Sequence, residues 1–262
     1  MTRTPNSSIT NALHILKCFS IDHPELSLSD IANYTDISKS TACRLLQTLE
    51  SEGFIHQNAN DNTYRLGSAL LSLTHTAINQ FTFLKEMTPF LKNLTNYTKE
   101  TSYIALLEHK DVIYIKKEDS PFRVQMLSHI GRRNPAYCTG SGLAMLAFID
   151  EQTISDMFPQ QLPTYTKHTI STLEELQEEL KVIRKQGYAI SKGQYTENII
   201  SIGAPIFNTK QKVIASITVT GPINRIMINL HKFIEALIQE SDKITNFIER
   251  KEEDVLLEIF TK

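Results

Sequence analysis

Apolar side chains near the N-terminus recur at the three- and four-residue spacing of amphipathic helices. Three of them mark one face of a first helix over residues 9–19: Ile9, Leu13 and Leu16. Ser27 and Asp30 have the spacing of a capping box, which predicts a short second helix. A third helix is expected to begin at Ser38 and to end at Gly53, and its apolar face has four members: Ala42, Leu45, Leu46 and Leu49.

Two short apolar runs follow at 54–57 and 63–66, on either side of the Asn- and Asp-rich stretch 58–62. Apolar runs around such turn-forming residues predict a β-hairpin. Three helices and a hairpin, with a short turn between the second and third helices, indicate a winged helix-turn-helix over residues 1–67.

The next segment has no Asp, Glu, Lys or Arg between Gly67 and Phe83, and its apolar residues fall at helical spacing. We expect a linker helix over residues 68–80 that is buried against a neighbour, such as a second subunit. Another helix is predicted from about residue 82 to residue 99, kinked or divided by Pro89.

Strand-like and helix-like segments alternate over the remainder, residues 81–262. Strands are predicted at 102–108, 112–118, 122–128, 188–191, 200–207 and 213–219. Helices are predicted at 142–149, 172–187 and 226–250. Turn signals between neighbouring strands indicate an α+β domain with an antiparallel sheet.

The composition of the 262-residue chain, 41% hydrophobic and 21% charged, is ordinary for a globular protein. No stretch has the roughly 18 apolar residues of a membrane span, and a secretory signal is not expected. The three cysteines are widely spaced, so we expect no disulfide framework and a cytoplasmic location. The net charge is −2, and residues 1–80 hold five basic against seven acidic side chains, which excludes DNA binding through bulk positive charge.

The first turn of the third helix nevertheless combines small hydroxyls with positive charge, in Ser38, Lys39, Ser40 and Thr41, with Arg44 one turn later. In a helix-turn-helix the N-terminal end of the second helix of the pair enters the major groove, and its unpaired amides favour phosphate. We therefore predict DNA contacts from these five residues and from Arg65 in the hairpin. The alternative is that Ser38 serves only as an N-cap, as in many helices that bind nothing.

Six stretches of the chain match a known family: ALHILKCF, LSLSDIANYTDISKSTACRLLQTLESEGFI, YRLGSALLSL, IGRRNPAYCTGSGLAMLAF, QGYAIS and GAPIFNTKQKVIASITVTGPINRI. The chain thus resembles the IclR-type bacterial transcriptional regulators over nearly its whole length. The resemblance implies a winged helix-turn-helix that binds a pseudo-palindromic double-stranded DNA operator as a homodimer or a dimer of dimers. It also implies a GAF-like C-terminal domain that binds a small effector, an organic acid such as a sugar acid, a keto acid or an aromatic acid.

By the same resemblance, six residues line the effector pocket: Gly140, Ser141, Ser191, Ser201, Thr218 and Thr220. The sequence agrees at two points, since a helix starting near Ser141 directs its amides at an anion, and Thr218 and Thr220 lie on one side of a strand. One departure is the run Ser-Lys-Gly-Gln at 191–194, where many members of the family carry acidic residues. It indicates a less negative pocket.

An enzyme is a rival class, but Thr139 stands where a GxSxG nucleophile motif needs its first glycine, and metal and dinucleotide motifs are missing. Cys138 is expected to be a small buried hydrophobe. Another alternative is a ligand sensor that acts through protein contacts, with a vestigial DNA module. We expect a non-enzymatic DNA-binding repressor without cofactor, metal or membrane partner, whose effector controls operator affinity through the linker helix.

Overall fold

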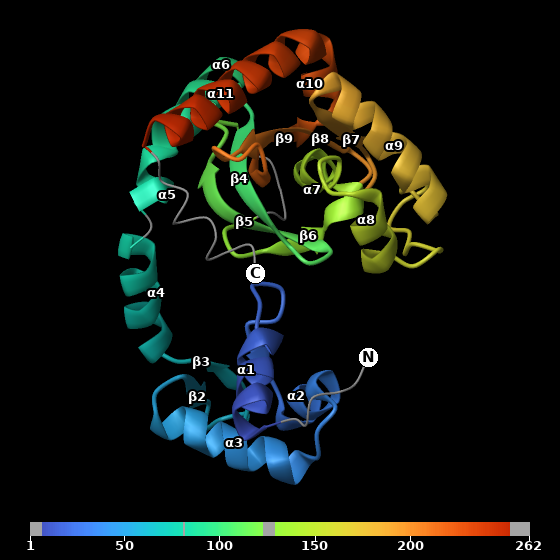
Figure 1. The fold of residues 1–262 in the computed structure, drawn as a ribbon. Helices are drawn as coiled ribbons and strands as arrows, with labels where there is room; N and C mark the ends of the chain where they lie inside the picture. The colour runs from blue at the N-terminus through green and yellow to red at the C-terminus, as the bar shows by residue number, and fades with distance from the viewer. Residues whose placement is uncertain (1–6, 81, 123–128, 252–262) are drawn as a thin grey trace. The chain divides into compact units, whose positions relative to one another are not determined.

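The computed structural model describes residues 7–80, 82–122 and 129–251 (Figure 1). Internal contacts divide the chain into two compact units, Met1–Phe81 and Thr82–Lys262. A hydrophobic core fills the first unit. In the second unit, one core lies on each face of a large sheet.

The first unit contains the three helices and the hairpin that the sequence predicts. The hairpin has a third strand beside it, which pairs with its second strand. This strand was not predicted, because two residues are too few to show a periodicity. In chain order the elements are α1 (Ser8–Cys18), β1 (Glu25–Leu26), α2 (Leu28–Thr35), α3 (Lys39–Ser51), β2 (Ile55–Gln57), β3 (Tyr64–Leu66) and α4 (Ala69–Gln80).

Side-chain caps fix where the helices of this unit begin. The Ser27 hydroxyl accepts a hydrogen bond from the Asp30 amide, and the Asp30 carboxylate accepts one from the Ser27 amide, which confirms the predicted capping box. Asp36 turns the chain between α2 and α3 with a φ of 54°. Ser38 then caps α3 by accepting from the Thr41 amide at 3.2 Å. These caps set the orientation of the first turn of α3.

The second unit is built on a six-stranded antiparallel sheet in the order β6-β5-β4-β9-β8-β7, which confirms the α+β class. The strands are β4 (Thr101–Glu108), β5 (Asp111–Glu118), β6 (Arg133–Pro135), β7 (Ala189–Lys192), β8 (Ile199–Phe207) and β9 (Val213–Pro222). Five of them correspond to predicted strands, and the short β6 was not predicted. The strand predicted at 122–128 lies, from residue 123 on, outside the described residues.

The helices of this unit are α5 (Thr82–Glu86), α6 (Thr88–Thr98), α7 (Gly140–Leu146), α8 (Glu151–Met157), α9 (Leu173–Gln186), α10 (Ile223–Ile226) and α11 (Leu230–Lys251). Pro89 lies in the first turn of α6 and divides it from α5, as predicted. α7 begins two residues earlier than predicted, because Thr139 caps it by accepting from the Gly142 amide. α8, which the sequence analysis missed, is capped by Asp150.

The helices cover the two faces of the sheet differently. α6 and α11 lie side by side over one face, where alternate strand residues such as Ile104, Ile202 and Val219 are buried (Figure 1). α7 lies on the opposite face, together with Tyr103 and Ala105. The period-two alternation of β4 thus divides its side chains between two separate cores.

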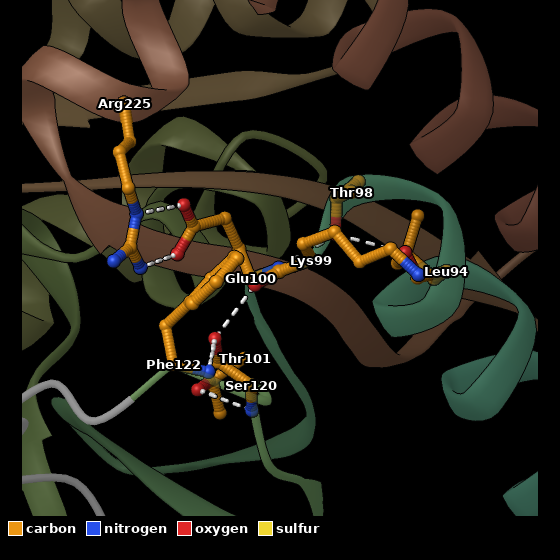
Figure 2. Close-up of polar contacts among 8 residues, drawn as sticks. All are labelled: Leu94, Thr98, Lys99, Glu100, Thr101, Ser120, Phe122 and Arg225. Carbon is orange, nitrogen blue, oxygen red and sulfur yellow. Dashed lines mark hydrogen bonds and ion pairs between the residues drawn. The ribbon is translucent and has the colours of Figure 1, made fainter.

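A partly buried ion pair joins α10 to the start of β4 (Figure 2). Glu100 is only 3% exposed, and it accepts from Arg225 Nε at 2.6 Å and from Arg225 Nη2. The guanidinium group also lies over the Phe122 ring, 5.2 Å from its centroid. A Cβ at Gly221 would overlap the Glu100 carboxylate, so only glycine leaves room for this pair.

Candidate functional site

Small hydroxyl groups cluster in the first turn of α3. Ser38 Oγ lies 3.0 Å from Ser40 Oγ and 2.9 Å from Thr41 Oγ1. Lys39 and Arg44 are exposed, and their side chains have no hydrogen-bonding or ionic partner in the described part of the chain. The structure therefore brings five of the six predicted DNA-binding residues together on the N-terminal half of α3.

Arg65 lies elsewhere in the first unit. On the sheet it stands between Glu25 of β1 and His56 of β2, which are its cross-strand partners. It also lines a groove of about 790 Å³ together with Glu50, near the C-terminal end of α3. Since a helix rises about 1.5 Å per residue, Glu50 is roughly 16 Å along the axis from Lys39. Arg65 is therefore separate from the cluster at the start of α3, and one of its two cross-strand partners, Glu25, is acidic.

Four hydroxyl side chains form a row across adjacent strands in the second unit. Ser191 is the cross-strand partner of Ser201, Ser201 of Thr220, and Thr220 of Thr101. Directly opposed residues in antiparallel strands share a face, so all four hydroxyls lie on the α7 side of the sheet. We call this set, residues 101, 191, 201 and 220, the hydroxyl row. It contains three of the six predicted effector residues.

The other three predicted effector residues, Gly140, Ser141 and Thr218, adjoin the hydroxyl row. The Ser141 and Thr218 hydroxyls lie 2.8 Å apart and are buried, and the Gly140 amide donates to Ser201 Oγ at 2.9 Å. Gly203, the cross-strand partner of Thr218, has the backbone of Gly140 directly against it. The structure thus brings all six predicted residues into one region, where α7 meets β7, β8 and β9.

The hydrogen bonds at this region differ from the expectation that the α7 amides point at an anion. The Gly140 and Gly142 amides both donate to protein hydroxyls, those of Ser201 and Thr139. The Thr220 hydroxyl, by contrast, has no hydrogen-bond partner among the residues that the structure describes. Ser201 Oγ accepts from Gly140, which leaves its own proton available for donation. The available donors are therefore hydroxyls of the sheet.

The structure also shows what occupies the place of the family's acidic run. The Ser191 hydroxyl donates to the Cys138 carbonyl oxygen at 2.7 Å, and Lys192 is exposed. No carboxylate stands at 191–194, as the sequence itself shows. The side of the hydroxyl row formed by β7 therefore has no carboxylate from this run.

Two residues of this region were missed in the sequence analysis. Thr101 completes the hydroxyl row, and Gly203 lets α7 contact β8 directly. The sequence shows which side chains of β4 share a face, and likewise for β8, because side chains alternate along a strand. It does not show how these strands are aligned with β9, because that depends on which strands pair.

Cys138 is the small buried residue that the sequence predicts, with 0% exposure. Burial raises the pKa of its thiol from 9.0 to about 12, so the thiol is protonated at neutral pH. Within residues 7–80, 82–122 and 129–251, His, Cys, Asp and Glu side chains do not gather in threes that could hold a metal ion. Across the same residues, no helix has the length and apolar character needed to span a membrane.

Two family models match the chain. The IclR helix-turn-helix domain matches residues 8–59, and the model described as bacterial transcriptional regulator IclR C-terminal matches residues 75–246. The first match contains all of α3, and the second contains the hydroxyl row. Together they cover α3 and the hydroxyl row, and Arg65 lies between the two matched ranges.

Individual proteins agree with these models. The HTH-type transcriptional regulator KdgR of Dickeya chrysanthemi is 30% identical over 88% of this chain and 76% of its own length. The transcriptional repressor IclR of Escherichia coli is 27% identical over 84% of this chain and 81% of its own length.

Solved structures agree as well. An IclR-type regulator from Alicyclobacillus acidocaldarius has a TM-score of 0.80 and 26% identity, covering 91% of this chain and 97% of its own. An IclR homologue from Microbacterium hydrocarbonoxydans, complexed with 4-hydroxybenzoate, has a TM-score of 0.76 and 23% identity. The match covers 92% of this chain and 98% of the homologue's chain. These relatives are regulators rather than enzymes, and with both models matched, the chain belongs to the IclR family of DNA-binding bacterial transcriptional regulators.

Proposed function

We propose that this protein is a repressor that binds a pseudo-palindromic operator through α3 and is controlled by a small carboxylate bound against the hydroxyl row. The observation that supports effector binding is the pair of available hydroxyl donors on two opposed residues, Ser201 and Thr220. Hydrogen bonds to a charged acceptor each contribute about 1.5–3 kcal/mol, so two hydroxyls are a substantial anchor for a carboxylate. The homologue that holds 4-hydroxybenzoate supports an acid as ligand.

We assign residues 1–67 to DNA binding, 68–80 to a linker helix and 81–262 to effector binding and oligomerisation. Two leucines of α4 are open to solvent, Leu71 at 73% and Leu73 at 54% exposure. Large apolar side chains that are open to solvent on a helix favour a protein partner. A second copy of this chain fits the proposal, because a dimer would double the few phosphate contacts that one subunit offers.

In the DNA-binding half, Ser38, Ser40 and Thr41 permit close approach to the backbone, and Lys39 and Arg44 supply charge. Arg65 is the weaker candidate, since Glu25 and Glu50 lie beside it and partly offset its charge. In the effector half, Ser191, Gly140, Ser141 and Thr218 hold the hydroxyl row and α7 in place. The proposal places this regulator in the cytoplasm, with the DNA.

The test is a selection of genomic fragments from the source organism by the purified full-length protein at physiological salt. Enrichment of a pseudo-palindrome, lost when one of a panel of acids such as 4-hydroxybenzoate, pyruvate or gluconate is added, is the expected result. Enrichment only when an acid is present would contradict release by effector. A dimeric, folded protein that enriches nothing with or without acids would favour the second candidate.

That second candidate is a ligand sensor that acts through protein contacts. The position of Glu25 opposite Arg65 favours it, because a neighbouring negative charge weakens one of the six predicted DNA contacts. It predicts that effector binds with normal affinity while operator binding stays undetectable at low salt.

A further inference from the structure

The exposed side of α3 carries polar side chains in addition to the hydroxyl cluster at its start. Most of these side chains form hydrogen bonds within the protein. Thr48 Oγ1 donates to the Arg44 carbonyl oxygen at 3.2 Å, and Ser51 Oγ donates to the Thr48 carbonyl oxygen at 2.8 Å. Glu50 Oε1 accepts from the Gln57 amide at 2.9 Å. The Ser38 hydroxyl is within hydrogen-bond distance of the Ser40 and Thr41 hydroxyls.

Three long polar side chains of α3 lack such a partner among the described residues: Lys39, Arg44 and Gln47. All three are exposed. Arg44 and Gln47 are three residues apart, a spacing that puts them on one face of a helix. Ala42, Leu45 and Leu46 face the core, so this face is directed away from the rest of the unit.

We propose that Gln47 is a base-reading residue, which recognises an adenine within two base-pair steps of a guanine recognised by Arg44. This proposal rests on the proposed function, because it needs α3 to lie in the major groove. A carboxamide offers a donor and an acceptor together, the pattern that matches adenine N7 and N6, whereas a guanidinium matches guanine N7 and O6. Hydroxyls that are already engaged in the helix have less capacity to read a base edge.

The spacing of the two side chains fits adjacent bases. Residues three apart on an α-helix are separated by about 4.5 Å along its axis. Successive base pairs are separated by about 3.4 Å. A recognition helix that follows the groove therefore brings Gln47 to the base pair next to that of Arg44, or to the one after it. Lys39, at the N-terminal end with the hydroxyl cluster, is left for phosphate.

The experiment is selection of binding sites from a randomised duplex pool by the full-length wild-type protein and by Gln47→Ala, Gln47→Glu and Ser51→Ala. Wild-type sites should hold the guanine and the adenine in each half-site. Gln47→Ala should relax the adenine position alone, with about a tenfold loss of preference there. Gln47→Glu should change the preference at that position toward cytosine, whose amino group a carboxylate accepts from. Ser51 is also exposed but engaged with Thr48, so Ser51→Ala should leave the site unchanged.

Salt dependence separates base reading from backbone contact. Gln47→Ala should leave the slope of log Kd against log salt unchanged, whereas Lys39→Ala should reduce it by about one. If Gln47→Ala weakens all sequences equally and the selected site is unaltered, Gln47 does not read a base and the inference is wrong. A wild-type protein that selects no site at all would instead overturn the proposed function, which the genomic selection would show independently.

Discussion

The hydroxyl of Ser141, in the first turn of α7, lies 2.8 Å from the hydroxyl of Thr218 on β9, and both are buried. This contact joins residues that are 77 positions apart. It orients α7 over the sheet so that the Gly140 amide reaches Ser201. The hydroxyl of the neighbouring Thr220 has no such partner among the described residues, so in the proposed site it is available to a ligand.

Thr220→Val should weaken binding of the effector. Valine has nearly the same shape as threonine, so the change removes one hydrogen-bond donor and leaves the packing intact. Affinity for the acid that binds best in the panel should fall about tenfold or more, as expected for one hydrogen bond to a charged acceptor. Calorimetric titration gives the affinity, and Thr164→Val at an exposed position is the control. Equal affinity in both variants would exclude Thr220 from the site.

Arg44→Ala should weaken operator binding by about 1–3 kcal/mol, the range for a lost bidentate base contact. Effector affinity should not change, because Arg44 belongs to the other unit of the chain. Mobility-shift titration with the selected operator measures the loss, with Lys17→Ala on the exposed side of α1 as control. Normal operator binding by Arg44→Ala would mean that α3 is not the recognition helix.

Arg225→Met should destabilise the second unit by about 3–5 kcal/mol, because it leaves the Glu100 carboxylate buried without its cation. The double variant with Glu100→Leu should recover most of this loss. Arg133→Met is the matched control, since the Arg133–Glu108 pair is far more exposed and should contribute about 1 kcal/mol or less. Urea denaturation gives the free energies of unfolding. A similar loss in both single variants would contradict the role of burial.

The free energy of unfolding should fall at alkaline pH through Cys138. Below about pH 8.5 its thiol is protonated in both states, so Cys138 adds no pH dependence there. Between this pH and the native pKa of about 12, the unfolded chain loses the proton while the folded chain keeps it. Stability is then lost at up to about 1.4 kcal/mol per pH unit. Urea denaturation from pH 7 to 10 should show a steeper decline for wild type than for Cys138→Ala.

Gly203→Ala should destabilise the second unit, because a Cβ there would overlap the Gly140 carbonyl oxygen. The atoms nearest to this Cβ belong to the backbone of Gly140 and Ser141, which cannot move aside as the end of a flexible side chain could. We expect a loss of about 1–3 kcal/mol or more, measured by thermal unfolding. Effector affinity should fall as well, since α7 must shift away from the hydroxyl row. An unchanged melting temperature would show that α7 is not held in contact with β8.

Local signals predicted most of the fold. The Ser27–Asp30 capping box, the Ser38 N-cap and the hairpin turns each depend on residues close in sequence, and the structure contains all of them. The α8 helix was not predicted although Asp150 is a recognisable N-cap. Its seven residues are too few to show a helical periodicity.

Long-range pairings could not be predicted. Glu100 and Arg225 are 125 residues apart, and neither has a local feature that indicates the other. The same holds for Thr101, which enters the hydroxyl row only through the pairing of β4 with β9. Residue type identified the hydroxyls of the candidate site, whereas sheet register decided which of them lie together. Gln47, the proposed base-reading residue, was not among the predicted contacts, since only the hydrogen bonds of its neighbours distinguish it from them.

The contact between Gly140 and Gly203 brings the backbone of α7 directly onto the backbone of β8, with no side chains between them. A layer of side chains could be compressed or repacked, but two main chains in contact cannot. The proposed ligand would therefore bind over a part of the second unit that resists deformation. Any movement that accompanies its binding is expected in elements other than the contact between α7 and β8.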